Sequence, residues 1–148
     1  MAAPPSKTLK DLNGKWVMNK TLSDDTDAIL AMQNVSWFLR KAIAFATITL
    51  SITEYTKDGS THIDISQTAT GGVKGTTELR TLDWTFRDHK DGIFGEVKGK
   101  SRWVKVEDLE DDDDKKWLSH GWDDGGEGEH VQSYVESVGG GWTANQVS

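Results

Sequence analysis

Residues 12–20 read LNGKWVMNK, and residues 21–43 continue as TLSDDTDAILAMQNVSWFLRKAI. The first stretch predicts a short strand over about 14–21. In the second, Ser23 is a candidate N-cap, and the acidic residues after it suit the positive end of a helix dipole. Apolar residues then recur at helical spacing, with a second helix expected over 35–45. We therefore predict one strand followed by a helix-turn-helix cap.

After this helical part, apolar and polar residues alternate with a period of two, which is typical of strands. Residues 47–55 and 61–69 alternate in this way around the turn sequence TKDGS, so they predict a β-hairpin. Further strands are predicted over 71–81, 82–88, 92–106, 129–137 and 141–147. A sheet of this length avoids exposed edges by closing, so we predict a mainly β protein: an antiparallel up-and-down β-barrel of about 8–10 strands.

The charge of the chain is unevenly distributed. The net charge is −7 over 148 residues, but residues 107–129 hold eleven acidic residues and two lysines, a net charge of −9. The rest of the chain is close to neutral and carries no basic stripe, so no nucleic-acid partner is expected. The run EDDDDKK (110–116) lacks the spaced ligands of a calcium loop and predicts a solvated, mobile loop. We expect residues 1–11 to be a flexible lead-in and residues 12–148 to form one domain carrying the acidic insert 107–129.

Several classes of site and location are disfavoured by the composition. The chain has no cysteine, and its four histidines show no metal-ligand spacing. Phosphate-binding and dinucleotide-binding motifs are also missing, so we predict no metal and no cofactor. We find no secretory leader and no apolar run long enough to span a bilayer, which indicates a cytoplasmic protein without stable membrane insertion.

The order of these elements resembles a known family. The stretch NGKWVMNKTLSDDTDAILAMQNVSWFLRKAIAFATITLSI (13–52) is similar to the intracellular lipid-binding proteins of the calycin superfamily, the fatty-acid-binding-protein-like family. The likeness is closest to small lipocalin-like proteins of filamentous fungi, and it weakens beyond about residue 106. It implies a barrel that binds a hydrophobic ligand under a helical lid.

One family feature is missing. Members that bind carboxylates carry an Arg-x-Tyr pair on the last strand, whereas this chain ends in GWTANQVS and has no arginine after Arg102. The chain also stops where that family continues for one or two strands. Either the barrel is short and partly open, or the chain ends early, or a neighbouring chain completes the sheet. An unpaired terminal strand favours a homodimer.

Seven tryptophans in a chain of this length indicate either a packed core or an aromatic-lined pocket. Arg80, Arg87 and Arg102 lie on successive predicted strands, and one buried arginine could hold an acidic or ketone ligand through its planar fork. Arg102 is preferred because it precedes Trp103 in an apolar stretch. The predicted ligand-binding residues are Trp37, Phe38, Leu50, Trp84, Phe86, Arg102, Trp103, Tyr134 and Trp142.

His130, Tyr134 and Glu136 alternate onto one face of a predicted strand. If that face points inward, His130, Tyr134 and Arg102 are the candidate catalytic residues; if it points outward, they are ordinary surface residues.

The leading functional prediction is binding of a small hydrophobic molecule of lipid, polyketide or terpenoid type inside the barrel. The alternative is a cofactor-independent cyclase or isomerase of secondary metabolism that uses the same cavity as a reaction chamber. A third hypothesis is an interaction module that acts through the acidic insert.

Overall fold

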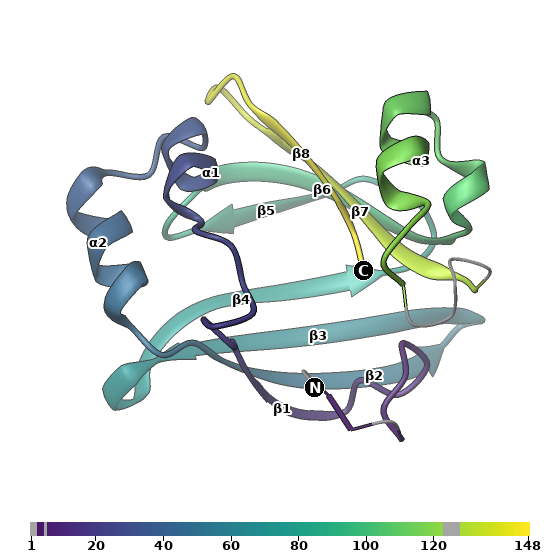
Figure 1. Cartoon of the computed structure of the whole chain (residues 1–148), viewed down its shortest axis with the longest axis horizontal. Helices are drawn as coiled ribbons and strands as arrows, with labels where there is room; N and C mark the ends of the chain where they lie inside the picture. The colour runs from purple at the N-terminus through teal and green to yellow at the C-terminus, as the bar shows by residue number, and fades with distance from the viewer. Residues whose placement is uncertain (1–2, 5, 123–127) are drawn as a thin grey trace.

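The computed structural model describes every residue except 1–2, 5 and 123–127. Its strands form two four-stranded antiparallel sheets, in the orders β1-β2-β3-β4 and β5-β6-β7-β8 (Figure 1). The strands of the first sheet are β1 (Gly14–Val17), β2 (Thr49–Lys57), β3 (Ser60–Ala69) and β4 (Val73–Thr81). Those of the second are β5 (Arg87–Asp91), β6 (Gly95–Val104), β7 (His130–Ser137) and β8 (Thr143–Val147). The mainly β, antiparallel prediction is confirmed.

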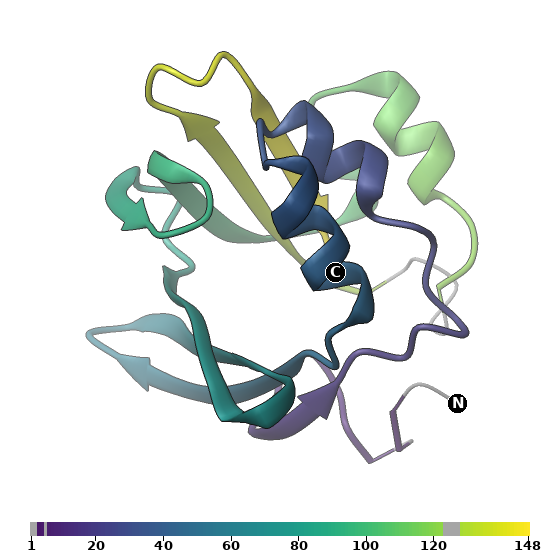
Figure 2. The same cartoon turned by 90° about the vertical axis from the view of Figure 1, so that its left-hand side faces the viewer.

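The two sheets do not close into a barrel. Among the described strands, β4 does not pair with β5 and β1 does not pair with β8, and Figure 2 shows the sheets as separate layers. The predicted strand 82–88 is instead a turn up to residue 86. Within it, the Asp83 carboxylate accepts the Thr85 N–H at 3.0 Å, and Trp84 has a left-handed φ of 57°. An Asx-type turn of this kind breaks the strand ladder, so the closed-barrel prediction is not confirmed.

A small apolar cluster joins the two sheets. Ile63 of β3, Leu82 of the connecting segment and Val131 of β7 are buried against one another. The Trp103 side chain packs on this cluster, and its Nε1 donates to Thr61 Oγ1 at 3.3 Å. The faces that carry Ile63 and Val131 are therefore the inner faces of the two sheets.

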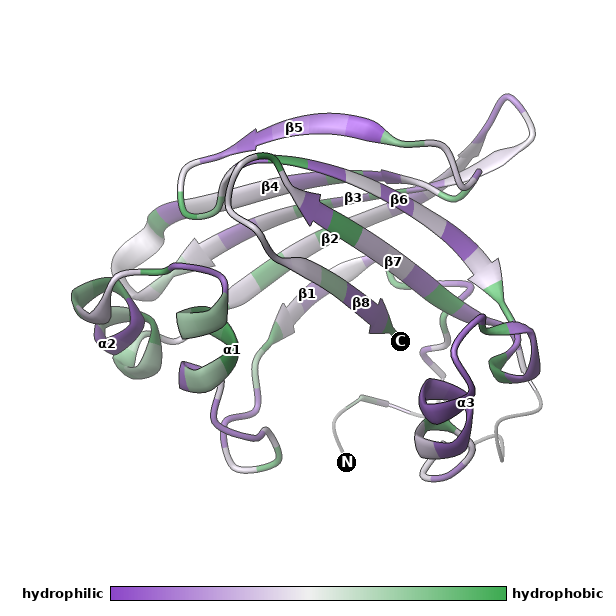
Figure 3. Cartoon of the chain, turned by 90° about the horizontal axis from the view of Figure 1, so that it is seen from above, coloured by the Kyte–Doolittle hydropathy of each residue, from purple (hydrophilic) through white to green (hydrophobic). Residues whose placement is uncertain are grey.

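The predicted helix pair follows β1, as α1 (Asp27–Met32) and α2 (Trp37–Phe45). Ser36 is the N-cap of α2 and accepts the Leu39 N–H. The prediction of Ser23 as the cap of the first helix is wrong, because Ser23 lies outside the helix and donates to the Asn19 carbonyl. Both helices lie at one end of the sheets, and Figure 3 shows that they are largely apolar.

The acidic run is a helix, α3 (Asp112–Leu118), and not the predicted loop. Asp111 caps it by accepting the N–H groups of Asp113 and Asp114 at 2.9 and 3.0 Å. The acidic residues fill its first turn and the lysines its last, as the helix dipole favours. Its apolar side covers the outer face of the second sheet, in a cluster of Val104, Val106 and Leu109 with Leu118, Trp122 and Val147.

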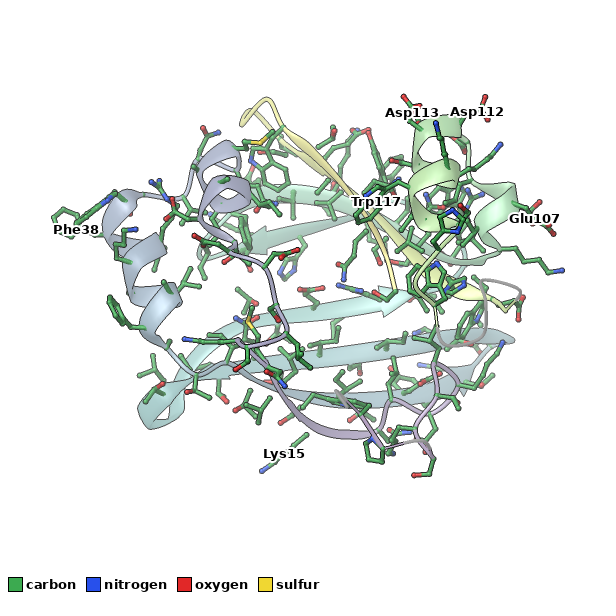
Figure 4. The ribbon with its side chains drawn as sticks, in the orientation of Figure 1. Lys15, Phe38, Glu107, Asp112, Asp113 and Trp117 are labelled. Carbon is green, nitrogen blue, oxygen red and sulfur yellow. The ribbon has the colours of Figure 1, made fainter. Side chains whose placement is uncertain are left out.

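We expect Asp111→Ala to lower the free energy of unfolding by about 1 kcal/mol, because two N–H groups of α3 lose their acceptor. Urea unfolding measures the change. Asp113→Ala is the matched control: Asp113 lies in the first turn and points away from the protein (Figure 4). Equal losses for the two variants would contradict the capping role.

Candidate functional site

A pocket of about 460 Å³ lies between the inner face of the second sheet and strand β4. We call it the inter-sheet chamber. Its polar lining includes Glu78, Arg80, His89, Asp91, Ser101 and Ser133. Its apolar lining includes Phe94, Val97, Gly99, Val135, Trp142 and Ala144. A pocket of this size and mixed lining is typical of sites for small organic molecules.

Strand β4 supplies a charged pair to the chamber. Arg80 lies directly opposite Ile63 in the β3–β4 register, and Glu78 lies opposite Ile65. Since residues opposite each other share a face, both charged side chains point to the inner side. Arg80 Nε and Nη2 both donate to Glu78 Oε2, at 3.0 and 2.6 Å.

Strands β6 and β7 supply a pair of hydroxyl groups. Ser101 and Ser133 lie opposite each other in register, and both are buried. Their Oγ atoms are 2.9 Å apart. One hydroxyl therefore donates to the other within the chamber wall.

The β5–β6 hairpin closes one side of the chamber around a buried carboxylate. Asp91 accepts the N–H groups of Ile93 and Phe94, at 2.6 and 2.9 Å, and so holds the turn. His89 Nε2 lies 4.0 Å from the same carboxylate. Within the turn, Phe94 packs edge-on against Trp142, which gives the chamber an aromatic wall.

Helix α1 reaches the chamber through Gln33 at its C-terminal end. The next residue, Asn34, donates from Nδ2 to the Gly140 carbonyl at 2.9 Å. This bond ties the connection between α1 and α2 to the β7–β8 turn.

Arg87 lies at the edge of the chamber, but Asp83 holds it. Its Nη1 and Nη2 donate to the two carboxylate oxygens of Asp83 at 2.8 and 2.7 Å. These hydrogen bonds hold the pKa of the Asp83 carboxyl well below its usual range and raise the pKa of Arg87. The pair remains charged at neutral pH and fixes the connection between the sheets.

A second cleft, of about 370 Å³, lies on the outer face of the second sheet beside the start of α3. Trp84, Phe86 and Tyr134 line it, and Lys100 Nζ lies 4.1, 4.7 and 5.7 Å from their ring centroids. Arg102 stacks on Trp84 at 4.1 Å. The aromatic rings therefore surround cations of the protein itself.

The predicted ligand-binding residues are divided among several places. Tyr134 and Trp142 line the inter-sheet chamber. Tyr134 also lines the outer cleft, together with Trp84 and Phe86. Trp103 packs on the cluster between the sheets.

Four further candidates contact neither pocket directly. Arg102 lies on the outer face of β6 and hydrogen-bonds Gln132, and Leu50 is half-buried on β2. Trp37 and Phe38 of α2 are exposed, Phe38 by 80%. Figure 4 shows Phe38 pointing away from the sheets.

His130, a predicted catalytic residue, is 2% exposed, and its ring packs against the Trp122 ring at 4.2 Å between centroids, with the two planes tilted by 45°. It lies on the outer face, because it is two residues from Gln132 along β7 and opposite the α3-covered Val104. Neither ring nitrogen has a hydrogen-bond partner among the described residues. An unpartnered buried imidazole is unfavourable for stability.

We therefore expect His130→Leu to raise the free energy of unfolding by about 1 kcal/mol, because an apolar side chain replaces unsatisfied polar atoms. Thermal and urea unfolding measure it. His120→Leu, at an exposed histidine, is the control and should change stability by less than about 0.5 kcal/mol. A destabilised His130→Leu protein would show that the ring has a polar role.

Two classes of feature are not found in the described part of the chain. Residues outside 1–2, 5 and 123–127 contain no group of three or more potential metal ligands. Of the helices that the structure describes, none has the length and apolar character to cross a membrane.

No protein-family model matches the chain. Two curated fungal proteins are similar to it. One is "Probable pericyclase scpY" of Mollisia scopiformis, 30% identical over 126 residues, which cover 84% of this chain and 66% of that protein. The other is "Pericyclase pydY" of Acremonium sp, 28% identical over 127 residues, which cover 84% of this chain and 68% of that protein. The chain thus spans about two thirds of the length of these relatives. Neither is named as a lipid-binding protein, so they do not support the resemblance to the fatty-acid-binding family.

Proposed function

We propose that this protein is a pericyclase of fungal secondary metabolism, which folds a linear, unsaturated molecule in the inter-sheet chamber and promotes its ring closure. The observation that carries the proposal is the chamber of about 460 Å³ between the sheets, in a chain similar to two proteins named pericyclases. These similarities favour the enzyme alternative over the plain hydrophobic carrier that we preferred from the sequence.

The chemistry suits such a chamber. A pericyclic step moves electrons around a ring of reacting atoms in one event, so it needs neither a nucleophile nor a proton relay. What the protein supplies is shape: it holds the two ends of the chain in a near-attack geometry, and so removes the conformational freedom that the free chain must lose before it reacts. The wall of Phe94, Val97, Val135 and Trp142 offers an apolar surface against which a chain can fold.

Apolar burial supplies part of the binding energy. A ligand that buries about 300 Å² of apolar surface gains about 7 kcal/mol before the entropy costs of association. Micromolar binding needs about 8 kcal/mol net, so polar contacts to the ligand or a larger buried area must supply the rest.

Deletion of the gene in the organism that encodes the chain tests the proposal. We expect loss of a cyclic metabolite and accumulation of a linear precursor of the same mass. The purified protein should convert this precursor into the cyclic product without any added cofactor. An unchanged metabolite profile, or a precursor that differs from the product in mass, would count against a pericyclase.

A further inference from the structure

We infer that the substrate carries a neutral carbonyl group conjugated to one of its reacting double bonds, and that Arg80 binds the carbonyl oxygen. The inference rests on the proposed function and adds to it a substrate class and a residue that acts on the reacting atoms.

The position of Arg80 supports this assignment. It lies on the inner face of β4, opposite the buried Ile63, and lines the inter-sheet chamber. Its side chain is only 20% exposed. A guanidinium that is largely withdrawn from water forms stronger hydrogen bonds to a ligand than one at the surface.

Only some of the N–H donors of Arg80 are used by the residues that the structure describes. A guanidinium carries five N–H donors, and Glu78 accepts only from Nε and Nη2. Among the residues that the structure describes, none accepts a hydrogen bond from Arg80 Nη1. Because Glu78 holds one edge of the planar fork, the orientation of the remaining donors is fixed before a ligand arrives.

The other lysine and arginine side chains that line the chamber are already engaged. Arg87 is bound to both carboxylate oxygens of Asp83. Lys100 lies over the aromatic rings of the outer cleft. The hydroxyls of Ser101 and Ser133 are hydrogen-bonded to each other. Arg80 is therefore the cation best placed to serve a ligand in the chamber.

The charge balance defines the ligand class. Glu78 neutralises Arg80 at a distance of 2.6 Å, and the carboxylate of Asp91 also lines the chamber. A ligand carboxylate would be repelled by both acids, whereas a neutral ketone, amide or ester oxygen would accept from Arg80 without that repulsion. A conjugated carbonyl thus fits better than a free fatty acid.

A hydrogen bond to this oxygen also promotes the reaction. It withdraws electron density from the conjugated double bond, which then reacts more readily with an electron-rich diene in the same chain. In such a closure three π bonds become two σ bonds and one π bond, so no atom is gained or lost. Arg80 keeps its proton and stabilises the charge that develops on the oxygen in the transition state.

Two small probes of equal carbon skeleton test binding: trans-4-phenyl-3-buten-2-one, a conjugated ketone, and trans-1-phenyl-1-butene, which lacks the oxygen. With a carbon-13 label at the carbonyl, isotope-edited infrared spectroscopy reads the hydrogen bond directly. We expect the carbonyl band to move to lower frequency in the wild-type protein, and the ketone to bind about tenfold more tightly than the hydrocarbon, as one net hydrogen bond allows.

Four variants make the test specific. Arg80→Met should abolish the band shift and the preference for the ketone. Arg102→Met, the same substitution on the outer face of the second sheet, should retain both. Glu78→Gln should raise the affinity for trans-cinnamate, because it removes the nearest negative charge. If Arg80→Met does not fold, Arg80→Lys replaces it in the binding test, with its fold checked by thermal melting. We expect Arg80→Lys to weaken the band shift.

Turnover of the linear precursor separates the two hypotheses. We expect kcat for Arg80→Met to fall about 100-fold, as for loss of one oxyanion donor. If the band shift is present but the wild-type protein does not convert the precursor, the proposed function fails and the carbonyl site remains. If Arg80→Met keeps the shift or full turnover, or if neither probe binds to the wild-type protein, the inference about Arg80 is overturned.

Discussion

Gly99→Leu is expected to abolish ring closure while the protein remains folded. Gly99 lies on the inner face of β6, paired with Val135, and lines the chamber. A Cβ atom built at this position lies 3.5 Å from both the Tyr134 carbonyl oxygen and Val135 Cγ2, which is ordinary contact. The rest of a leucine side chain then has to occupy the chamber. Since the chamber supplies the catalysis, the rate should fall by several orders of magnitude, toward that of the free precursor.

Product formation from the linear precursor measures this effect, and urea unfolding verifies the fold. Gly92→Leu is the matched control, because Gly92 lies in the exposed β5–β6 turn with no atom within 4 Å of a built Cβ. Normal turnover by Gly99→Leu would mean that ring closure occurs somewhere other than the inter-sheet chamber.

Ile63→Ala is expected to produce the largest loss of stability, about 2–5 kcal/mol. Ile63 is 2% exposed and belongs to the cluster with Leu82 and Val131 that joins the sheets. Truncation leaves a cavity at that junction. Because domains of this size are stable by about 5–15 kcal/mol, the loss is a large share of the total.

Urea unfolding measures the loss. Val73→Ala, on the same sheet but 63% exposed, is the control and should cost less than about 0.5 kcal/mol. Similar costs for the two variants would show that the cluster does not hold the sheets together.

The local elements were largely predictable from the sequence. The two-residue period of 47–55 and 61–69 corresponds to β2 and β3, and the Asp58–Gly59 turn between them has φ values of 51° and 78°. Turns with two left-handed residues match the twist of paired strands, which is why this dipeptide is informative. The second helix was predicted to within two residues.

The arrangement of the two sheets was harder to predict from the sequence. Residues 82–88 alternate like a strand, but the hydrogen bond from Thr85 to Asp83 converts their first half into a turn. The mutual repulsion of consecutive aspartates predicts a loop, whereas the cap at Asp111 and the covering of an apolar face stabilise this run as a helix. Both outcomes depend on contacts that a linear pattern does not contain.

The candidate site could be predicted only in part for the same reason, because its location depends on contacts between distant segments. Alternation along β7 correctly grouped His130 with Tyr134, but it did not reveal which face points inward. α3 covers the face of His130, so the chamber lies on the side of Ser133 and Val135. Arg80 was considered with Arg87 and Arg102, and its advantage became visible only through the pairing with Ile63 and Glu78.

The turn at 82–86 has a consequence for how this fold can diversify. In a closed barrel, strand number and stagger fix the internal diameter. Here each sheet keeps its own ladder of hydrogen bonds, and the two layers are joined by a short connector, the apolar cluster around Ile63 and the Trp103–Thr61 hydrogen bond. Substitutions in the connector could therefore adjust the volume of the inter-sheet chamber to longer or shorter substrates without changing the pairing of any strands.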